Sequence, residues 1–380
     1  MKQILFVVPQ LTHGGSNKSL ATLLALFAKE SDLSFSVVAL NAYSNHDPYY
    51  DIFKSILLPL SNLYSISVSY TPLRKLLNAL NNFLHLDFWT LLYKYEAHRL
   101  QKRYHFNKVV GFEESYATRF ASYFNCTKIA WLHCDYDSYW EESNHRDESV
   151  IYSKFDSIVC VSEFAKRVFL KYYPDVADRV SHIYNLLDIE DIKRKSTEPI
   201  EDDHFSSDDF NIISIGRFVG LKQFHLIPQF VKQTLEESPN LKFHWYIIGD
   251  GDTNLIAFTQ RQIENLGLHD YITLLGSKKN PYPFILKSDL LVCMSRTESW
   301  SYTINEANVL HTPVVTLRCG SSEEVIVKDA GCIINQESLP SLLATLIENK
   351  GGFYSQMKEN LSLFNYNNEA IIIKLKELLT

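Results

Sequence analysis

Short apolar segments rich in β-branched and aromatic residues alternate with segments of helical periodicity along both halves of this chain. Apolar runs bounded by polar or glycine-containing turns predict buried strands, and the amphipathic intervals predict helices. Strands that alternate with helices build parallel sheets from βαβ units. The pattern therefore predicts an α/β chain with two Rossmann-like, doubly wound parallel sheets, one in each half.

The predicted strands also divide the chain into domains. In the first half they cover 3–11, 35–40, 108–112, 128–133, 157–162 and 180–184. In the second half they cover 211–215, 242–248, 271–275, 289–294, 313–317 and 331–334. The interval between the halves is polar and acidic, and such a stretch cannot supply a hydrophobic core. We therefore predict an N-terminal domain over 1–195, an acidic linker over 196–209 and a C-terminal domain over 210–380, with a cleft between the domains. In this division the last helix is free to pack back on the N-terminal domain.

Charge and cysteine content exclude several classes of protein. A chain of 380 residues with a net charge of −7 and no block of lysine or arginine is unlike a nucleic-acid-binding protein. Its six cysteines are scattered without a Cys-x-x-Cys pair, so neither a zinc site nor a disulfide framework is expected. No apolar run reaches the length of a membrane span, and the run 4–8 is too short for a signal peptide. We expect a cytoplasmic protein that needs no metal or other cofactor.

The segment 73–103 differs from the rest of the first half. Its leucines and Phe83 recur at helical spacing, and lysine and arginine residues are interspersed among them. Two interpretations remain open. The segment could form a helix that lies in a membrane interface, at the inner face of the cell membrane. Alternatively, its apolar face could pack on the sheet of its own domain, as amphipathic helices of βαβ folds ordinarily do.

Two carboxylates, Glu298 and Glu306, lie on either side of a turn that is expected to open a helix. Glu298 follows the predicted strand 289–294, at the carboxyl edge where open α/β sheets bind ligands. The backbone N–H groups of Ser301, Tyr302 and Thr303 would point out of the helix N-terminus, where they favour a phosphate. An acid, an anion site and a second acid together suit a nucleotide sugar. An alternative is that Thr303 and Glu306 form a capping box, in which case Glu306 is structural.

Two cations follow the first predicted strand of the second half. The loop from Gly216 to Lys222 includes Arg217, so a guanidinium and an ammonium group leave the same strand. Fixed cations at this place could neutralise a departing diphosphate, whose negative charge grows in the transition state of a displacement at a sugar carbon. The alternative is that both are ordinary solvated surface cations.

Two features of the first half are weaker signals. His13-Gly14-Gly15-Ser16 follows the first strand and precedes a helix, so the backbone at Gly15 and Ser16 could approach a ligand. The alternative is a plain turn from strand to helix, because the loop lacks the GxGxxG fingerprint. His133 leaves the strand 128–133 and would bring an imidazole to the same edge. The alternative is a histidine of the core or rim whose ring nitrogens are hydrogen-bonded within the protein.

A series of loose motifs in a fixed order spans nearly the whole chain. They are Gly14-Gly15, His133, Val161-Ser162-Glu163, Tyr184-Asn185-Leu186-Leu187-Asp188, Gly216-Arg217 with Lys222, Ile248-Gly249-Asp250-Gly251, Leu275-Gly276-Ser277, Glu298 with Glu306, and Thr312-Pro313-Val314-Val315. In this order the chain resembles the family-four retaining glycosyltransferases. The resemblance implies the GT-B architecture of two Rossmann-like domains, with a nucleotide-sugar donor held by the second domain, an acceptor held by the first, and no metal requirement.

The resemblance also implies a role for each matching residue. Arg217 and Lys222 would hold the diphosphate, and the backbone at Gly15, Ser16 and Gly216 would approach the phosphates. Glu298 would bind the hydroxyls of the transferred sugar, and His133 would lie near the reacting end of that sugar. Glu306 would bind the ribose, and Ser277 and Lys278 would face the nucleobase. Three positions depart from the family pattern, because Ser299-Trp300 follows Glu298, Gln223 follows Lys222 and Leu186 follows Asn185.

The expected activity is transfer of a hexosyl or N-acetylhexosaminyl unit from a UDP-sugar to a glycan or lipid-linked acceptor in surface polysaccharide synthesis. Two alternatives remain open. One is a nucleotide-sugar epimerase or hydrolase on the same architecture. The other is a non-catalytic partner subunit of a glycosyltransferase.

Overall fold

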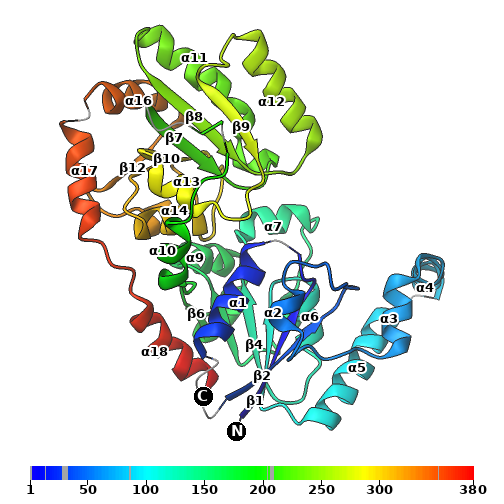
Figure 1. The fold of residues 1–380 in the computed structure, drawn as a ribbon. Helices are drawn as coiled ribbons and strands as arrows, with labels where there is room; N and C mark the ends of the chain where they lie inside the picture. Colours follow the sequence, from blue (N-terminus) through cyan, green and yellow to red (C-terminus); the bar gives the residue numbers. More distant parts are fainter. Residues whose placement is uncertain are drawn as a thin grey trace. The chain divides into compact units, whose positions relative to one another are not determined.

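The computed structural model describes residues 2–12, 14–27, 33–84, 87–202, 204–205, 209–349 and 351–380. The chain forms two compact units, the first of Met1–Leu186 with Asn367–Thr380 and the second of Leu187–Tyr366. Each unit contains a parallel sheet with helices packed around it (Figure 1). The predicted fold class is therefore confirmed.

The sheet of the first unit has the strand order β2-β1-β3-β4-β5-β6. Its strands are β1 Lys2–Val8, β2 Leu33–Ala39, β3 Lys108–Phe112, β4 Thr127–Leu132, β5 Ser157–Cys160 and β6 Val180–His182. All of the pairings are parallel. Because the chain turns outward from β1 to β2 and then returns to β3, the order reverses between β1 and β3. Such a switch point is where open α/β sheets bind ligands, outside the carboxyl ends of the strands.

The helices of the first unit connect these strands. They are α1 Gly15–Phe27, α2 Tyr50–Phe53, α3 Asn62–Ser69, α4 Thr71–Leu84, α5 Phe88–Tyr104, α6 Tyr116–Ala121, α7 Tyr136–Glu142, α8 Ser149–Tyr152, α9 Glu163–Tyr172, the 3₁₀ turn η1 Pro174–Arg179, and α18 Asn368–Leu379. α9 shows why such segments become helices: Ser162 caps its N-terminus by accepting the N–H of Ala165, and Ala165, Val168 and Phe169 form a buried stripe at helical spacing.

The sheet of the second unit has the order β12-β11-β10-β7-β8-β9. Its strands are β7 Phe210–Ile215, β8 Phe243–Ile248, β9 Ile272–Gly276, β10 Leu290–Cys293, β11 Val314–Leu317 and β12 Gly331–Ile334, and all pair in parallel. The chain runs outward from β7 to β9 and then returns to β10 beside β7. The switch point of this sheet therefore lies between β7 and β10.

The second unit also contains the helices that cover this sheet. They are α10 Ile189–Ser196, η2 Gly220–Lys222, η3 Phe224–Leu226, α11 Ile227–Glu237, α12 Thr253–Asn265, α13 Tyr282–Lys287, α14 Tyr302–Val309, α15 Ser322–Val325, η4 Gln336–Ser338, α16 Leu339–Glu348 and α17 Phe353–Ser362. Central strands are buried on both faces, as the successive residues Ile212 and Ile213 of β7 illustrate. The one polar atom of the Trp245 side chain is satisfied, because its Nε1 donates to Ser214 Oγ at 3.0 Å.

The division between the units differs from the predicted one. The second unit begins at Leu187, and α10 packs against α13 and α14. The stretch predicted as a linker also packs on the second unit, because the ring of Phe205 lies 4.6 Å from that of Tyr246 and 5.3 Å from that of Phe284. The polar composition of 196–209 suggested a linker, because it gave no indication that Phe205 packs on the second unit.

The C-terminal helix α18 belongs to the first unit. Lys108 Nζ, at the start of β3, donates a hydrogen bond to the carbonyl of Leu378 at 2.7 Å. Among the helices of the described residues, none is both long and apolar enough to cross a membrane.

Candidate active site

The two loops that leave the switch point of the second sheet carry three of the predicted side chains. The loop after β7 contains Arg217 and Lys222, and the loop after β10 contains Glu298. Because β7 and β10 are neighbours in the sheet, their carboxyl ends lie side by side. The backbone joins the loops as well, since the N–H of Arg296 donates to the carbonyl of Leu221 at 2.8 Å.

Lys222 and Glu298 form an ion pair across these loops. Ser295 Oγ also donates to Glu298 Oε1 at 2.6 Å. The Glu298 side chain is only 12% exposed, and that of Lys222 is 27% exposed. Burial is the largest single influence and would lower the pKa of Lys222, but the charge of Glu298, the charge of Cys293 and the hydrogen bond to Glu298 together outweigh it and raise the pKa. The lysine therefore stays charged, and it holds the carboxylate in one orientation.

Arg217 is exposed beside this pair. The positive charge of Arg217 repels the ammonium group of Lys222. This repulsion partly offsets the rise in the pKa of Lys222. No carboxylate in the described part of the chain forms an ion pair with Arg217, in contrast to Lys222. The guanidinium is therefore available for an anionic ligand.

The backbone of the Arg217 loop is held against the loop after β8. The N–H of Gly216 donates to the carbonyl of Ile248 at 3.0 Å, and the N–H of Phe218 donates to that of Asp250 at 2.8 Å. A Cβ atom on Gly249 would lie 1.8 Å from the carbonyl oxygen of Gly216. Only glycine permits this approach, which fixes the backbone on both sides of Arg217.

A second glycine contact positions Glu298, and the sequence analysis did not single it out. Gly320 follows β11 with a φ of 42°, and a Cβ atom there would lie 2.0 Å from the carbonyl oxygen of Glu298. The N–H of Ser321 donates to the same oxygen at 2.8 Å. A glycine just after the predicted strand 313–317 was the available signal. The partner of that glycine was not apparent from the sequence.

The start of α14 excludes the capping-box interpretation of Glu306. Ser301, not Thr303, is the N-cap, and its Oγ accepts the N–H of Ile304 at 3.4 Å. Glu306 is the fifth residue of the helix, too far along to reach the N-cap. Its buried carboxylate accepts from the hydroxyl of Tyr282 at 3.4 Å.

The anion site predicted at Ser301, Tyr302 and Thr303 would lie at this helix end, and it stays a prediction. Tyr302 and Thr303 are the first residues of α14. N–H groups at the first positions of a helix have no partner within the helix and favour anions.

The loop after β9 carries Ser277 and Lys278, which were predicted to face the nucleobase. Ser277 is exposed, but Lys278 Nζ pairs with Asp202 Oδ2 at 2.6 Å. The hydrogen bond from Lys278 is the main cause that lowers the pKa of Asp202 to about 2. The Lys278 ammonium group therefore already has a partner within the segment that was predicted to be a linker.

The switch point of the first sheet brings α1 to the loop after β3. Ser16 Oγ donates to Glu113 Oε2 at 2.8 Å. Asn17 Nδ2 donates to the carbonyls of Gln10 and Thr12 and so closes the turn before α1. Gly15 is the exposed first residue of that helix, and His13 lies outside the described residues.

His133 follows β4, next to this switch point. Its backbone N–H donates to Glu114 Oε2 at 2.9 Å, and its ring centroid lies 4.6 Å from that of Phe112. Burial lowers the pKa of His133 to about 3. It also raises the pKa of Glu114, although hydrogen bonds from the His133 and Cys134 amides oppose this shift. His133 is consequently a neutral imidazole at physiological pH.

The neutral state of His133 predicts a pH dependence of stability. The unfolded histidine has a pKa near 6.5 and binds more protons than the folded one between about pH 6.5 and 3. The free energy of unfolding therefore falls as the pH drops through this window, by about 2 kcal/mol at pH 5 from this residue. Urea denaturation of the wild type and of His133→Asn at pH 7 and pH 5 measures the difference. An equal loss of stability in both proteins would show that His133 does not titrate in this way.

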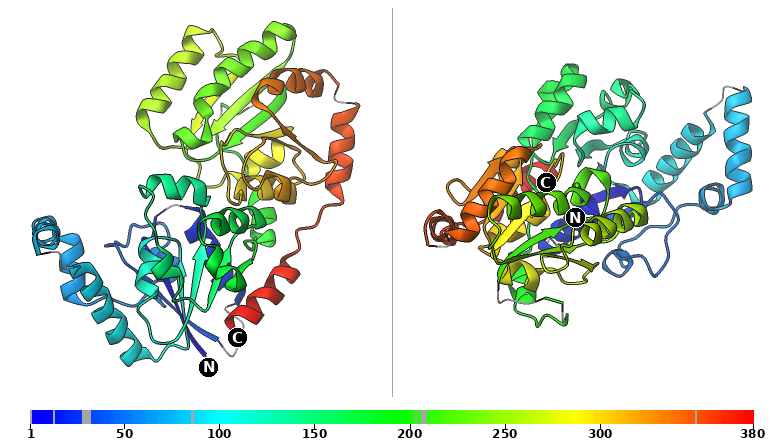
Figure 2. Two further views of the ribbon diagram at one scale, coloured as in Figure 1. Left: turned by 180° about the vertical axis from the view of Figure 1, so that it is seen from behind. Right: turned by 90° about the horizontal axis from the view of Figure 1, so that it is seen from above.

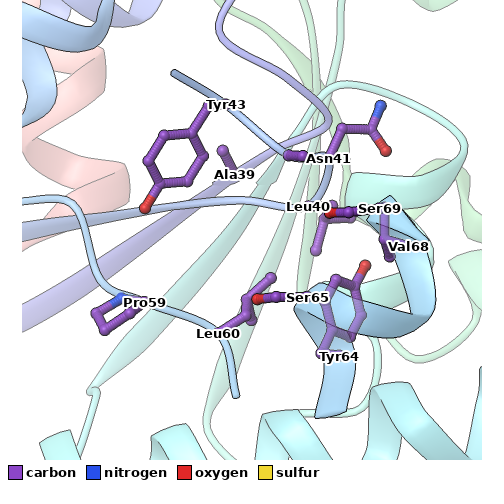
Figure 3. Close-up of a pocket in the computed structure, with 11 residues that line it drawn as sticks. Ala39, Leu40, Asn41, Tyr43, Pro59, Leu60, Tyr64, Ser65, Val68 and Ser69 are labelled. Atoms are coloured by element: carbon purple, nitrogen blue, oxygen red, sulfur yellow. The ribbon is translucent and has the colours of Figure 1, made fainter. Parts of the chain in front are cut away.

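A cavity of about 250 Å³ opens at the carboxyl end of β2 (Figure 3). The tyrosine rings of Tyr43 and Tyr64 and the hydroxyls of Ser65 and Ser69 contribute to its wall. The remaining lining residues are Ala39, Leu40, Asn41, Ala42, Pro59, Leu60 and Val68. A recess with aromatic rings and a few polar groups is typical of small-ligand sites.

The structure thus gathers the predicted residues at two places. Arg217, Lys222, Glu298 and the start of α14 share the switch point of the second sheet. Gly15, Ser16 and His133 lie at the carboxyl edge of the first sheet. The residues that the sequence analysis missed are Glu113, Glu114, Asp202, Tyr282, Ser295 and Gly320.

Two Rossmann-like units with these strand orders define a protein of the GT-B fold. Residues 209–349 match the model of the family described as Glycosyl transferases group 1. The second unit therefore carries a glycosyl transferases group 1 domain.

Individual proteins show the same likeness. An uncharacterized glycosyltransferase of Methanocaldococcus jannaschii is 30% identical over 179 residues, which cover 46% of this chain and 43% of that protein. The Vi polysaccharide biosynthesis protein VipC/TviE of Salmonella typhi is 28% identical over 120 residues, or 32% of this chain and 20% of that protein. These matches span less than half of either relative. The structure of HepE from Anabaena in complex with UDP and glucose has a TM-score of 0.74 and 16% identity, and covers 100% of this chain and 99% of that one.

Proposed function

We propose that this protein is a retaining glycosyltransferase that moves a hexosyl or N-acetylhexosaminyl unit from a UDP-sugar to a glycan or lipid-linked acceptor. The observation that carries the proposal is the Lys222–Glu298 ion pair at the switch point of the second sheet, with Arg217 beside it. The two cations suit a diphosphate, and the oriented carboxylate suits the hydroxyl groups of a sugar. The start of α14 and the buried Glu306 supply the anion site and the second acid of a nucleotide site.

The proposed reaction replaces the bond between the anomeric carbon and the diphosphate oxygen by a bond to the acceptor oxygen. The diphosphate leaves with the bonding electrons, and Arg217 and Lys222 stabilise its growing charge. The acceptor hydroxyl attacks the same face of the sugar, and its proton passes to the departing diphosphate oxygen. His133, neutral at physiological pH, would offer a hydrogen bond to the transferred sugar without adding charge.

Two similar proteins support the donor and the biological role. The HepE structure contains UDP and glucose, and the Salmonella relative is named for the biosynthesis of a polysaccharide. On this basis we propose a UDP-sugar donor and a role in surface polysaccharide synthesis.

The assay that tests the proposal combines a panel of nucleotide sugars with glycan and lipid-linked acceptors. We expect transfer with retained anomeric configuration, strictly dependent on an acceptor. Interconversion or hydrolysis of the donor without an acceptor would instead identify an epimerase or a hydrolase. Absence of donor binding would identify a non-catalytic partner.

The same assay in EDTA tests the proposed independence of metal. Arg217 and Lys222 would supply the positive charge that a metal ion otherwise provides. The Asp-x-Asp pair at Asp135 and Asp137, which follows β4, has structural partners: Asp135 caps α7, and Asp137 accepts from Lys171 and Tyr172. Loss of activity in EDTA that magnesium or manganese restores would overturn this part of the proposal.

Glu306→Gln tests the proposed ribose contact. We expect donor binding to weaken by about 1–3 kcal/mol, because a charged hydrogen bond to the ribose is lost. The melting temperature should change little, since glutamine keeps the oxygen that accepts from Tyr282. Titration calorimetry with UDP measures the change. Tyr282→Phe is the matched control, because it removes the internal hydrogen bond that Glu306→Gln keeps and leaves the carboxylate that Glu306→Gln removes. Unchanged affinity in Glu306→Gln would assign Glu306 a structural role.

The cavity at the end of β2 is the proposed binding place of the acceptor. Tyrosine rings and serine hydroxyls suit the apolar faces and hydroxyl groups of a sugar. Ser65→Trp should fill the cavity and raise the KM for the acceptor by roughly tenfold or more, with the KM for the donor unchanged. Ser362→Trp, at an exposed serine of α17, is the control. An acceptor KM that is the same in both variants would place the acceptor elsewhere.

A further inference from the structure

Helices α3, α4 and α5 form an arm within the connection from β2 to β3. In Figures 1 and 2, α3 and α4 lie at the outer end of α5, away from the sheet of the first unit. α5 anchors the arm, because Tyr93, Ala97 and Leu100 of this helix are buried in the core. α4 differs: each of its described side chains is exposed or only partly buried. Packing on the sheet therefore explains α5 but leaves α4 unexplained.

The arm exposes large apolar side chains from all three helices. Those that are more than half exposed are Leu63, Ile66, Tyr70, Leu76, Leu91 and Tyr95. Three of them, Leu63, Leu91 and Tyr95, line an apolar groove of about 270 Å³, to which α4 contributes Leu77. Exposed apolar side chains that gather around one groove mark an interaction surface, in contrast to scattered single ones.

The charge of the arm is opposite to that of the whole protein. Residues 62–104 contain six lysine or arginine residues against two acidic ones, while the full chain has a net charge of −7. Arg74 and Lys75 of α4 are both exposed. Other cations of the arm have internal partners: Arg99 pairs with Glu96, and Lys94 lies over the ring of Tyr123. Arg103 lies over the ring of Tyr104, and the exposed Lys102 belongs to the last turn of α5, beyond the groove residue Tyr95. Arg74 and Lys75, which directly precede Leu76 and Leu77 of α4, are thus the cations placed to meet a negatively charged surface together with the groove.

We propose that the α3–α5 arm docks on an anionic lipid surface. The exposed leucines and tyrosines enter the boundary between headgroups and acyl chains, and Arg74 and Lys75 contact the lipid phosphates. An amphipathic helix with cations beside its apolar face binds membranes in this way. The positive charge of the arm on a negatively charged protein also orients this side toward an anionic surface. A bilayer does not require a surface of matching shape. It would cover the apolar groove and at the same time place lipid phosphates next to Arg74 and Lys75.

Co-sedimentation of the full chain with vesicles tests this inference without any nucleotide sugar, so its failure would leave the proposed function unaffected. We expect binding to phosphatidylcholine vesicles that contain phosphatidylglycerol, weaker binding to pure phosphatidylcholine, and a decrease with added salt. Arg74→Ser with Lys75→Ser should weaken binding about 25-fold, because each cation near an anionic surface contributes roughly fivefold. Leu76→Ser with Leu91→Ser should weaken it about tenfold or more.

Matched controls separate this surface from general charge and hydrophobicity. Arg261→Ser with Lys287→Ser removes two exposed cations of the second unit, and Leu363→Ser removes an exposed leucine there. These variants should bind vesicles like the wild type. Equal weakening in arm and control variants, or no preference for phosphatidylglycerol, would overturn the proposal. A lipid-independent dimer that the arm variants dissociate in sedimentation equilibrium would also overturn it, because the surface would then belong to a second copy of the chain.

Discussion

Replacing Arg217 with alanine should lower the turnover of sugar transfer by about 10²- to 10³-fold, the usual effect of removing one preorganised charge-stabilising group. The melting temperature should be unchanged, because Arg217 is exposed and no described carboxylate pairs with it. Turnover with a saturating donor and acceptor, together with thermal unfolding, measures both effects. Lys287→Ala, at another exposed cation of the second unit, is the control.

Lys222→Ala should lower turnover by a similar factor but should also affect stability. The variant leaves the largely buried Glu298 without its cation, which costs about 1–3 kcal/mol of folding free energy. Adding Glu298→Gln should recover much of this stability without restoring turnover. Turnover close to wild type in both Arg217→Ala and Lys222→Ala would refute the assignment of the diphosphate site.

Gly320→Ala should reduce both stability and the turnover of sugar transfer. A Cβ atom there would lie 2.0 Å from the carbonyl oxygen of Glu298, so the loop that carries this glutamate must move. The positive φ of 42° adds about 1–2 kcal/mol for a residue other than glycine. A displacement of a positioned group by about 1 Å is enough to reduce turnover roughly 10²-fold. Urea denaturation and transfer kinetics measure the two consequences.

Gly267→Ala is the matched control for this prediction. Gly267 also has a positive φ, of 66°, but a Cβ atom there would meet nothing within 4 Å. The control should therefore lose stability from the backbone conformation alone and keep full turnover. If Gly320→Ala behaves like Gly267→Ala in the transfer assay, the contact with Gly320 does not position Glu298.

Local patterns along the chain were sufficient to predict the strands. Each predicted strand is present, with ends that differ by a few residues. The physical reason is that strands of a parallel sheet are covered on both faces, so each must be a continuous apolar run that is visible in the sequence. The same local reasoning placed Arg217 and Lys222 in one loop, and Glu298 in the turn before a helix.

The domain boundary could not be predicted in the same way. Phe205 packs on Tyr246 and Phe284, and Asp202 pairs with Lys278, so the acidic stretch belongs to the second unit. A polar composition indicates that a segment lacks a core of its own. It does not exclude that one aromatic ring and one carboxylate dock on a neighbouring core.

The sequence by itself determined the fold class, the strands and the kinds of residue at the sheet edges, because these follow from short-range periodicity and turn chemistry. Only the tertiary structure decided which of those residues meet. Lys222 contacts Glu298 across 76 positions because the strand order places β10 beside β7. Gly320 reaches Glu298 because β11 pairs with β10, and burial keeps His133 neutral. Such contacts depend on how distant segments pack, which local patterns along the chain do not encode.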